Sequence, residues 1–155
     1  SAAAQAGSGV GVMLKDRRGV PAAVEGKLDL AERAVAEAAR RGMPRARLYL
    51  DPVFCPIATA AGGLSGVLDT LRALGEIYPT CARIGGLSNV SFGMPERGLL
   101  NAAFAAMAIG AGITALICDT TDPGLTGTIK AAEALTGLDA SAKRFLAHHR
   151  RRARA

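Results

Sequence analysis

Aromatic residues are scarce in this sequence: Phe, Tyr and Trp make up 4% of its 155 residues, and Trp is absent. A core cannot depend on large rings here, so it must be built from Ala, Val, Leu and Ile, as in tightly packed α/β proteins. Half of the residues are apolar and 21% are charged. This balance excludes a disordered chain and predicts one ordinary globular domain over residues 1–155.

Cysteine is also scarce. The three thiols, Cys55, Cys81 and Cys118, are odd in number, far apart and without a Cys-x-x-Cys pair. This pattern argues against a disulfide framework and against a metal site built from cysteines. The sequence shows no signal peptide and no apolar run of membrane length. We therefore expect a cytoplasmic protein with reduced cysteines, no metal centre and no membrane partner.

Acidic residues are outnumbered by basic ones, which gives a formal charge of +6 and a pI of about 9.8. Much of the excess lies in "HHRRRARA" at residues 148–155. No basic run is interleaved with aromatic residues, so the pattern does not favour a nucleic-acid surface. We expect residues 138–155 to form a C-terminal helix and a solvated basic tail, with no nucleic-acid partner.

Short apolar runs recur along the chain, each followed by a helical pattern. The runs begin 32 to 37 residues apart, at residues 9, 46, 81 and 113, which suits a strand, a helix and two loops. They predict strands at 9–14, 46–51, 81–87 and 113–119, and helices at 28–42, 64–78, 98–112, 124–137 and about 140–150. The helix at 98–112 is apolar on almost all faces, which predicts that it is the most buried.

Four strand–helix units in series predict parallel strands joined by right-handed crossovers. Two architectures fit this pattern. One is an open doubly wound sheet, and the other is half of an eight-stranded βα barrel, which typically needs about 250 residues. Chain length favours the open sheet. The helix-like character of residues 1–7 favours a piece of a larger repeat.

The ends of the predicted strands carry the candidate site residues, because ligands in parallel α/β folds bind at the carboxyl ends of strands. Asp51 closes the second strand before a proline, and fits either a turn or a fixed acceptor in a pocket. The long loop 88–97 carries Asn89, which offers both an acceptor and donors, and Arg97, which suits an anion or solvent. Asp119 closes the fourth strand and is a further candidate.

Three motifs resemble the pterin-binding methyltransferases, which include the methyltetrahydrofolate:corrinoid methyltransferases and the folate domain of cobalamin-dependent methionine synthase. Residues 86–119, "GLSNVSFGMPERGLLNAAFAAMAIGAGITALICD", resemble the region of their seventh and eighth strands. "LYLDPVFCP" at 48–56 resembles their sixth-strand motif, and "GVGVMLKDRRGVP" at 9–21 their fifth strand and its loop. The Gly-Leu-Ser-Asn-Val-Ser motif is the most specific of these.

The resemblance implies a TIM barrel of which this chain supplies strands five to eight, the C-terminal half. Residues 1–7 then correspond to the tail of the fourth helix. The family's first four strands, which carry further pterin-binding Asp and Asn residues, have no counterpart here. A half barrel leaves apolar surface uncovered. The expected partners are therefore an N-terminal half barrel or a second copy of the chain, together with a corrinoid protein or free cobalamin.

The resemblance also assigns chemical roles. Asp51 matches the carboxylate that accepts hydrogen bonds from the pterin of tetrahydrofolate or methyltetrahydrofolate, and Asn89 matches the catalytic amide that contacts N5 while the methyl group moves to cobalt. Ser88 lies in the same motif and Arg97 matches a site position. Phe92 replaces a polar residue of the relatives and could pack on the pterin or the corrinoid.

Two other functions remain open. A dihydropteroate-synthase-like enzyme shares the Asp-Pro motif, but would be expected to carry a Ser-Arg-Lys type motif where this chain has Ser88, Asn89 and Val90. A non-catalytic subunit that only completes a barrel is the alternative from another class of protein.

Overall fold

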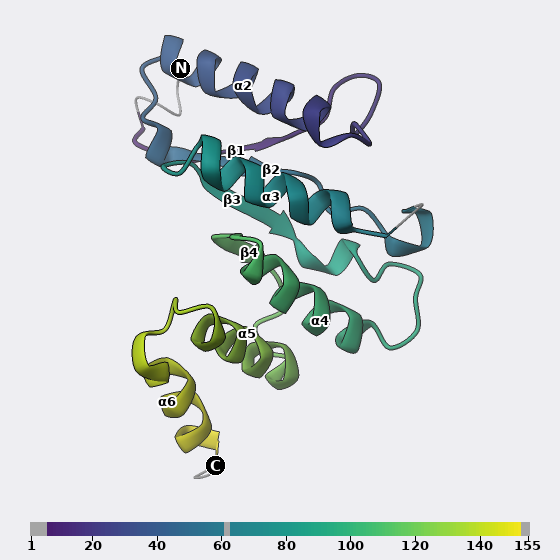
Figure 1. Cartoon of the computed structure of the whole chain (residues 1–155), viewed down its shortest axis with the longest axis vertical. Helices are drawn as coiled ribbons and strands as arrows, with labels where there is room; N and C mark the ends of the chain where they lie inside the picture. The colour runs from purple at the N-terminus through teal and green to yellow at the C-terminus, as the bar shows by residue number, and fades with distance from the viewer. Residues whose placement is uncertain (1–5, 61–62, 153–155) are drawn as a thin grey trace.

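A computed structural model of the chain describes residues 6–60 and 63–152. The elements follow one another in chain order along the longest axis of the molecule, from α2 at one end to α6 at the other (Figure 1). Most of the predicted helix tail at residues 1–7 lies outside the described residues, and Ala6 and Gly7 form a turn.

The four predicted strands form one parallel sheet in the order β1-β2-β3-β4. Each is shorter than its apolar run: the strands are β1 (Val10–Met13), β2 (Leu48–Asp51), β3 (Ala82–Gly86) and β4 (Ala115–Ile117). The consecutive order means that each crossover returns the chain to the next position along the sheet.

All five predicted helices are present, namely α2 (Val24–Arg40), α3 (Ser65–Ile77), α4 (Arg97–Gly110), α5 (Pro123–Leu135) and α6 (Lys143–Arg152). Short 3-10 turns lie at η1 (Arg45–Arg47), η2 (Ile57–Thr59), η3 (Leu87–Asn89) and η4 (Ala140–Ala142). Within the described ranges, no helix combines the length and the apolarity needed to cross a membrane.

Successive helices pack on one another, α2 on α3 and α4 on α5, which places them on one face of the sheet. A doubly wound sheet reverses its strand order and covers both faces with helices. The consecutive order and the one-sided helix layer are instead compatible with half of a βα barrel.

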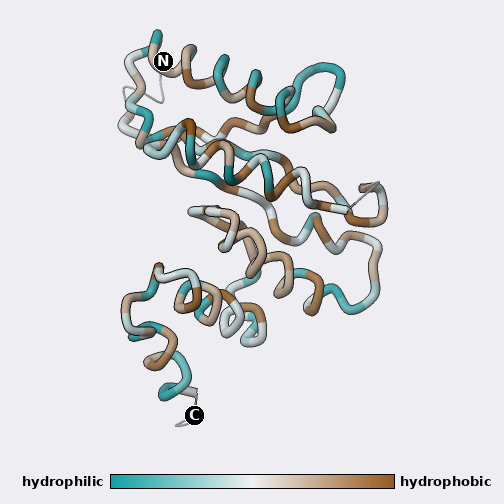
Figure 2. The backbone as a smooth tube through the Cα atoms, viewed as in Figure 1, coloured by the Kyte–Doolittle hydropathy of each residue, from teal (hydrophilic) through white to brown (hydrophobic). Residues whose placement is uncertain are grey.

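The core lies between the sheet and its helix layer, in two clusters. Leu48, Leu50 and Leu74 centre the first, against α2, and Phe54 and Phe104 meet edge to face at 5.0 Å in the second. In Figure 2 the apolar segments of α2 are turned toward the sheet and its hydrophilic segments point away from it. The described core therefore contains one pair of aromatic rings and is otherwise mainly aliphatic.

The prediction that the helix at 98–112 is the most buried is wrong. Leu99 and Met107 of α4 are exposed, at 68% and 53%, whereas α3 buries five side chains. An apolar helix is fully buried only when neighbours cover all its sides, and here the sheet and the adjacent helices cover one.

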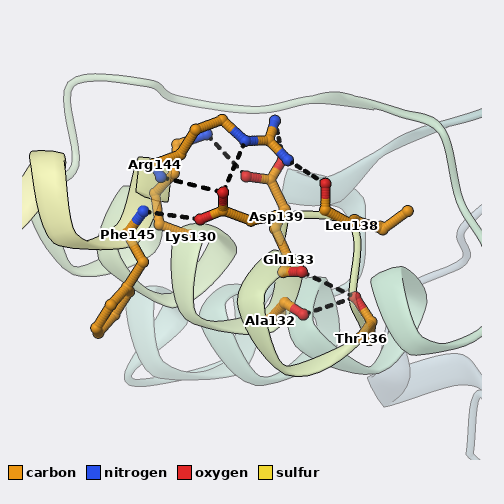
Figure 3. A network of polar contacts seen from close by, with 8 residues as sticks. All are labelled: Lys130, Ala132, Glu133, Thr136, Leu138, Asp139, Arg144 and Phe145. Atoms are coloured by element: carbon orange, nitrogen blue, oxygen red, sulfur yellow. Dashed lines mark hydrogen bonds and ion pairs between the residues drawn. The ribbon is translucent and has the colours of Figure 1, made fainter. Parts of the chain in front are cut away.

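A polar network docks α6 onto α5 (Figure 3). The buried Asp139 carboxylate accepts hydrogen bonds from the backbone N–H groups of Arg144 (3.0 Å) and Phe145 (2.9 Å), the start of α6. The Arg144 guanidinium donates to the Leu138 carbonyl at 2.7 Å and lies 3.6 Å from Glu133. The predicted C-terminal helix is thus attached to α5 in part by a polar network centred on the buried Asp139.

Candidate functional site

Among the described residues, helices cover one face of the sheet and leave the other, which we call the open face, without a helix. Side chains alternate along a strand, so Tyr49 and Asp51 point away from the buried Leu48 and Leu50. The strand register then assigns the remaining members of the open face, which are Gly11, Met13, Ala82, Ile84, Gly86, Ala115 and Ile117. Met13 is 53% and Ile117 64% exposed, so this face is apolar and partly uncovered.

Asp51 ends β2 on the open face, at the carboxyl edge of the sheet. Its Oδ1 accepts a hydrogen bond from the Val53 N–H at 2.8 Å. Burial raises the pKa of the Asp51 carboxyl, and the Val53 hydrogen bond opposes that shift only in part. No described cation pairs with this carboxylate, so donors from a ligand would be strongly favoured here.

The turn after Asp51 is held in a strained conformation. Val53 has a φ of 62°, which is unfavourable for a β-branched residue. Pro52 and Phe54 on either side of it are buried and anchor the turn in the core. Strain of this kind persists where the surrounding structure fixes it, and it clusters at functional sites. Its effect here is to fix the direction of the Asp51 carboxylate.

Asn89 lies in η3, one strand away from Asp51 and on the same face. A Cβ added to Gly86, which belongs to the open face, would lie 3.3 Å from Asn89 Nδ2, so the amide lies over the end of β3. The Asn89 side chain is exposed and forms no hydrogen bond with any described residue. Asp51 and Asn89 therefore present a carboxylate and a free amide at the carboxyl edge of adjacent strands.

The two glycines before η3 serve opposite faces of β3. A Cβ at Gly85 would overlap the ring of Phe54 on the helix side, which explains why no side chain is tolerated there. A Cβ at Gly86 would crowd Asn89 on the open side. The Gly-Gly pair thus allows both the core packing and the approach of the amide to the backbone.

Three of the other predicted site residues gather at a second place. Ser88, Arg97 and Asp119 line a hollow of about 250 Å³ between the ends of β3 and β4 and the starts of α4 and α5. Arg97 donates to the Ser88 carbonyl at 2.9 Å and to Ser91 Oγ at 3.1 Å, so its guanidinium braces the loop. Neither Asp51 nor Asn89 lines this hollow.

Asp119 is already engaged within its own turn. Its Oδ1 accepts from the side-chain hydroxyl of Thr121 at 2.6 Å and from the Thr121 N–H at 2.8 Å. These two bonds, the hydroxyl first, lower the pKa of Asp119. Asp122 caps α5 by accepting hydrogen bonds from the N–H groups of Gly124 and Leu125.

Sequence comparison gives this geometry a context. The chain is 31% identical over 133 residues, 86% of its length, to a protein of Eubacterium limosum named "Methylcorrinoid:tetrahydrofolate methyltransferase". The chain is therefore similar to a methyltransferase whose name contains a methylcorrinoid and tetrahydrofolate. The match spans 49% of that relative, so the chain corresponds to about half of its length. No family model matches the sequence.

Phe92 is the residue that the resemblance predicts to replace a polar residue of the pterin-binding methyltransferases. It is 68% exposed and lies in the loop between η3 and α4, outside the hollow that Arg97 lines. A large exposed apolar ring at a strand end is available for contact with a planar ligand or a partner surface. Its predicted role remains untested.

Two features of the structure escaped the sequence patterns. Lys27 is 4% exposed, lies on α2 and lines a large cavity. Asn101 carries a buried Oδ1 that no described donor meets. The periodicity of the sequence does not predict the burial of either side chain, because that burial depends on how separate segments pack against one another.

Proposed function

We propose that the chain is the pterin-binding half of a methyltransferase that moves a methyl group between N5 of methyltetrahydrofolate and the cobalt of a corrinoid. The observation that carries this proposal is the placement of Asp51 and Asn89 on one face, at the carboxyl edge of adjacent strands. The similarity to a methyltransferase whose name contains both substrates supports it.

In this proposal Asp51 binds the pterin ring. A pterin presents adjacent N–H and amino donors, and a carboxylate fixed by the Val53 turn accepts both. The pKa of Asp51 is raised by burial, so the empty site holds a poorly solvated carboxylate. Bound donors would replace its lost water and lower its pKa again, which makes binding favourable.

Asn89 acts on the leaving nitrogen. When the methyl carbon leaves N5, the electron pair of the C–N bond stays on nitrogen, while the cobalt(I) substrate supplies the pair for the new bond. A tertiary amine leaves poorly unless N5 gains a proton or a hydrogen bond. The free Asn89 amide donates to N5 as its charge develops, which stabilises the transition state more than the bound substrate.

The test replaces the amide. Asn89→Ala should slow methyl transfer by about 10²- to 10³-fold, as for other lost transition-state donors, with less than tenfold loss of folate affinity. Asn89→Asp is the matched variant, because it keeps the size and loses the NH₂ donor. Single-turnover rates and dissociation constants measured in parallel separate the two effects. A normal rate in both variants would remove Asn89 from the mechanism.

The half-barrel architecture is part of the same proposal. The chain corresponds to about half of its methyltransferase relative, and the open face leaves Met13 and Ile117 exposed. Four further strand–helix units, from another segment or from another copy of the chain, would cover this face and close the barrel. The same geometry suits a subunit that only completes a barrel, which a folate-binding measurement distinguishes.

A further inference from the structure

A large cavity lies beside the Asp51 turn and is not explained by the methyl-transfer chemistry. It measures about 580 Å³, within the range of small-molecule sites. Its walls come from the loop after β1, from α2, and from the loop after β2 with the first turn of α3. It therefore opens at the same carboxyl edge of the sheet as Asp51.

Lys27 is the charged group of this cavity. It is 4% exposed, and neither a carboxylate nor a hydrogen-bond acceptor among the described residues pairs with its ammonium group. Burial lowers the pKa of Lys27, and only the nearby Cys55 sulfur opposes this shift. The Lys27 side chain is mostly buried and its ammonium group has lost part of its hydration, so an anion that enters the cavity would interact favourably with it.

A second feature favours an anion at the same place. The first turn of α3, Ser65–Val67, lines the cavity, and no side chain caps this helix. A helix N-terminus carries partial positive charge and N–H groups that bind carboxylate or phosphate. The Lys27 ammonium group and the N-terminus of α3 thus line the same cavity, and both carry positive charge.

Most of the remaining wall residues are apolar. Val20, Pro21, Leu64 and Val67 line the cavity, so it suits a ligand with an apolar stem and an anionic end. The cavity is joined to Asp51 through a short turn: Val53 N–H donates to Asp51 Oδ1, and the Val53 carbonyl lies 3.8 Å from Cys55 Sγ, a cavity-lining atom. One molecule with a pterin at one end and a carboxylate at the other would match this arrangement.

We propose that this cavity holds the carboxylate-bearing tail of the folate substrate, with Lys27 and the N-terminus of α3 as its anion site. This inference rests on the proposed function, because it takes the pterin ring to lie at Asp51. It adds Lys27 as a substrate-binding residue and makes the tail, not the pterin alone, a determinant of affinity.

The experiment compares two ligands that differ only in the tail. Dissociation constants of methyltetrahydrofolate and of 5-methyltetrahydropterin, which lacks the whole aminobenzoyl-glutamate tail and so both of its carboxylates, are measured on the assembled protein. The variants are Lys27→Met, which keeps an apolar stem, and Lys15→Met, a matched control that removes an exposed lysine of the neighbouring loop outside the cavity. Melting temperatures show that each variant is folded.

We expect Lys27→Met to weaken binding of methyltetrahydrofolate about tenfold and to leave binding of 5-methyltetrahydropterin unchanged, with no effect of Lys15→Met on either ligand. Equal affinities of the wild type for both ligands, or equal losses for both in Lys27→Met, would overturn the tail site while leaving the pterin site in place. If the wild type binds neither ligand, the proposed function itself fails, and the tail site fails with it.

Discussion

At the scale of single residues, the position of the Asp51 carboxylate lowers the free energy of unfolding of the protein at neutral pH. Its carboxylate is partly buried, its one described hydrogen bond comes from Val53, and its pKa is raised above the ordinary value of 3.8. A group with a raised pKa stabilises the fold fully below that ordinary value, and this contribution is lost as the pH rises through the folded-state pKa. At neutral pH the charged Asp51 therefore destabilises the empty protein.

Asp51→Asn should consequently raise the free energy of unfolding at pH 7 by up to about 1 kcal/mol, because Asn keeps the Oδ1 acceptor and removes the poorly solvated charge. The gain should shrink as the pH falls toward 4. Affinity for methyltetrahydrofolate should fall by about two orders of magnitude. Urea unfolding at several pH values and calorimetric binding check both effects. Asp29→Asn, at an exposed position of α2, is the control, and equal stability changes in the two variants would contradict the account.

The sequence predicts the important residues of this edge only in part. Asp51 and Asn89 follow apolar runs, so a parallel-sheet interpretation places them at strand ends without further information. The positive φ of Val53 and the burial of Lys27 do not follow from pattern, because both are imposed by packing between segments distant in sequence. The separation of Arg97 and Asp119 from Asp51 is likewise a property of the folded loops.

At the scale of elements, β3 shows how one strand serves the core and the site together. Gly85 admits the Phe54 ring on the helix side, and Gly86 admits the Asn89 amide on the open side. The apolar run at 81–87 predicts that this strand exists. The observed strand order is also compatible with the series of apolar runs. The runs do not predict that the two adjacent glycines face different side chains on opposite sides of the sheet, because this depends on side chains from other segments.

Gly86→Ala should therefore slow methyl transfer about tenfold or more while costing little stability, because the new methyl group displaces a mobile amide and not the core. Gly11→Ala is the matched control: it adds the same methyl to the open face, where no described atom lies within 4 Å. Transfer rates and unfolding curves of the two variants provide the comparison. Similar rates in both would show that Asn89 is not held by this contact.

At the scale of the whole molecule, the open face is apolar surface that further strand–helix units are expected to cover. Helices cover one face of the sheet, and the other exposes a band of apolar side chains that a closed barrel would bury. Length alone favours an open doubly wound sheet, and the consecutive strand order instead suits half of a barrel. Strand order could not be predicted from spacing, since both architectures repeat a strand and a helix at the same interval.

The isolated chain should therefore associate through the open face. Light scattering during size-exclusion chromatography should give a mass of at least twice 15.8 kDa. Ile117→Glu, which places a charge on the open face, should shift the particle toward a monomer. Leu135→Glu on α5, exposed outside that face, should leave the mass unchanged. A stable, folded monomer of the unaltered chain would revive the open-sheet architecture.

The most direct test of the central claim is methyl transfer by the assembled protein, followed from the absorbance change as cob(I)alamin becomes methylcobalamin in the presence of methyltetrahydrofolate. We predict protein-dependent conversion that Asp51→Asn abolishes through lost binding and Asn89→Ala slows without comparable loss of binding. A folded, fully assembled protein that binds methyltetrahydrofolate but transfers no methyl group would contradict the catalytic role, and one that does not bind it would contradict the pterin site.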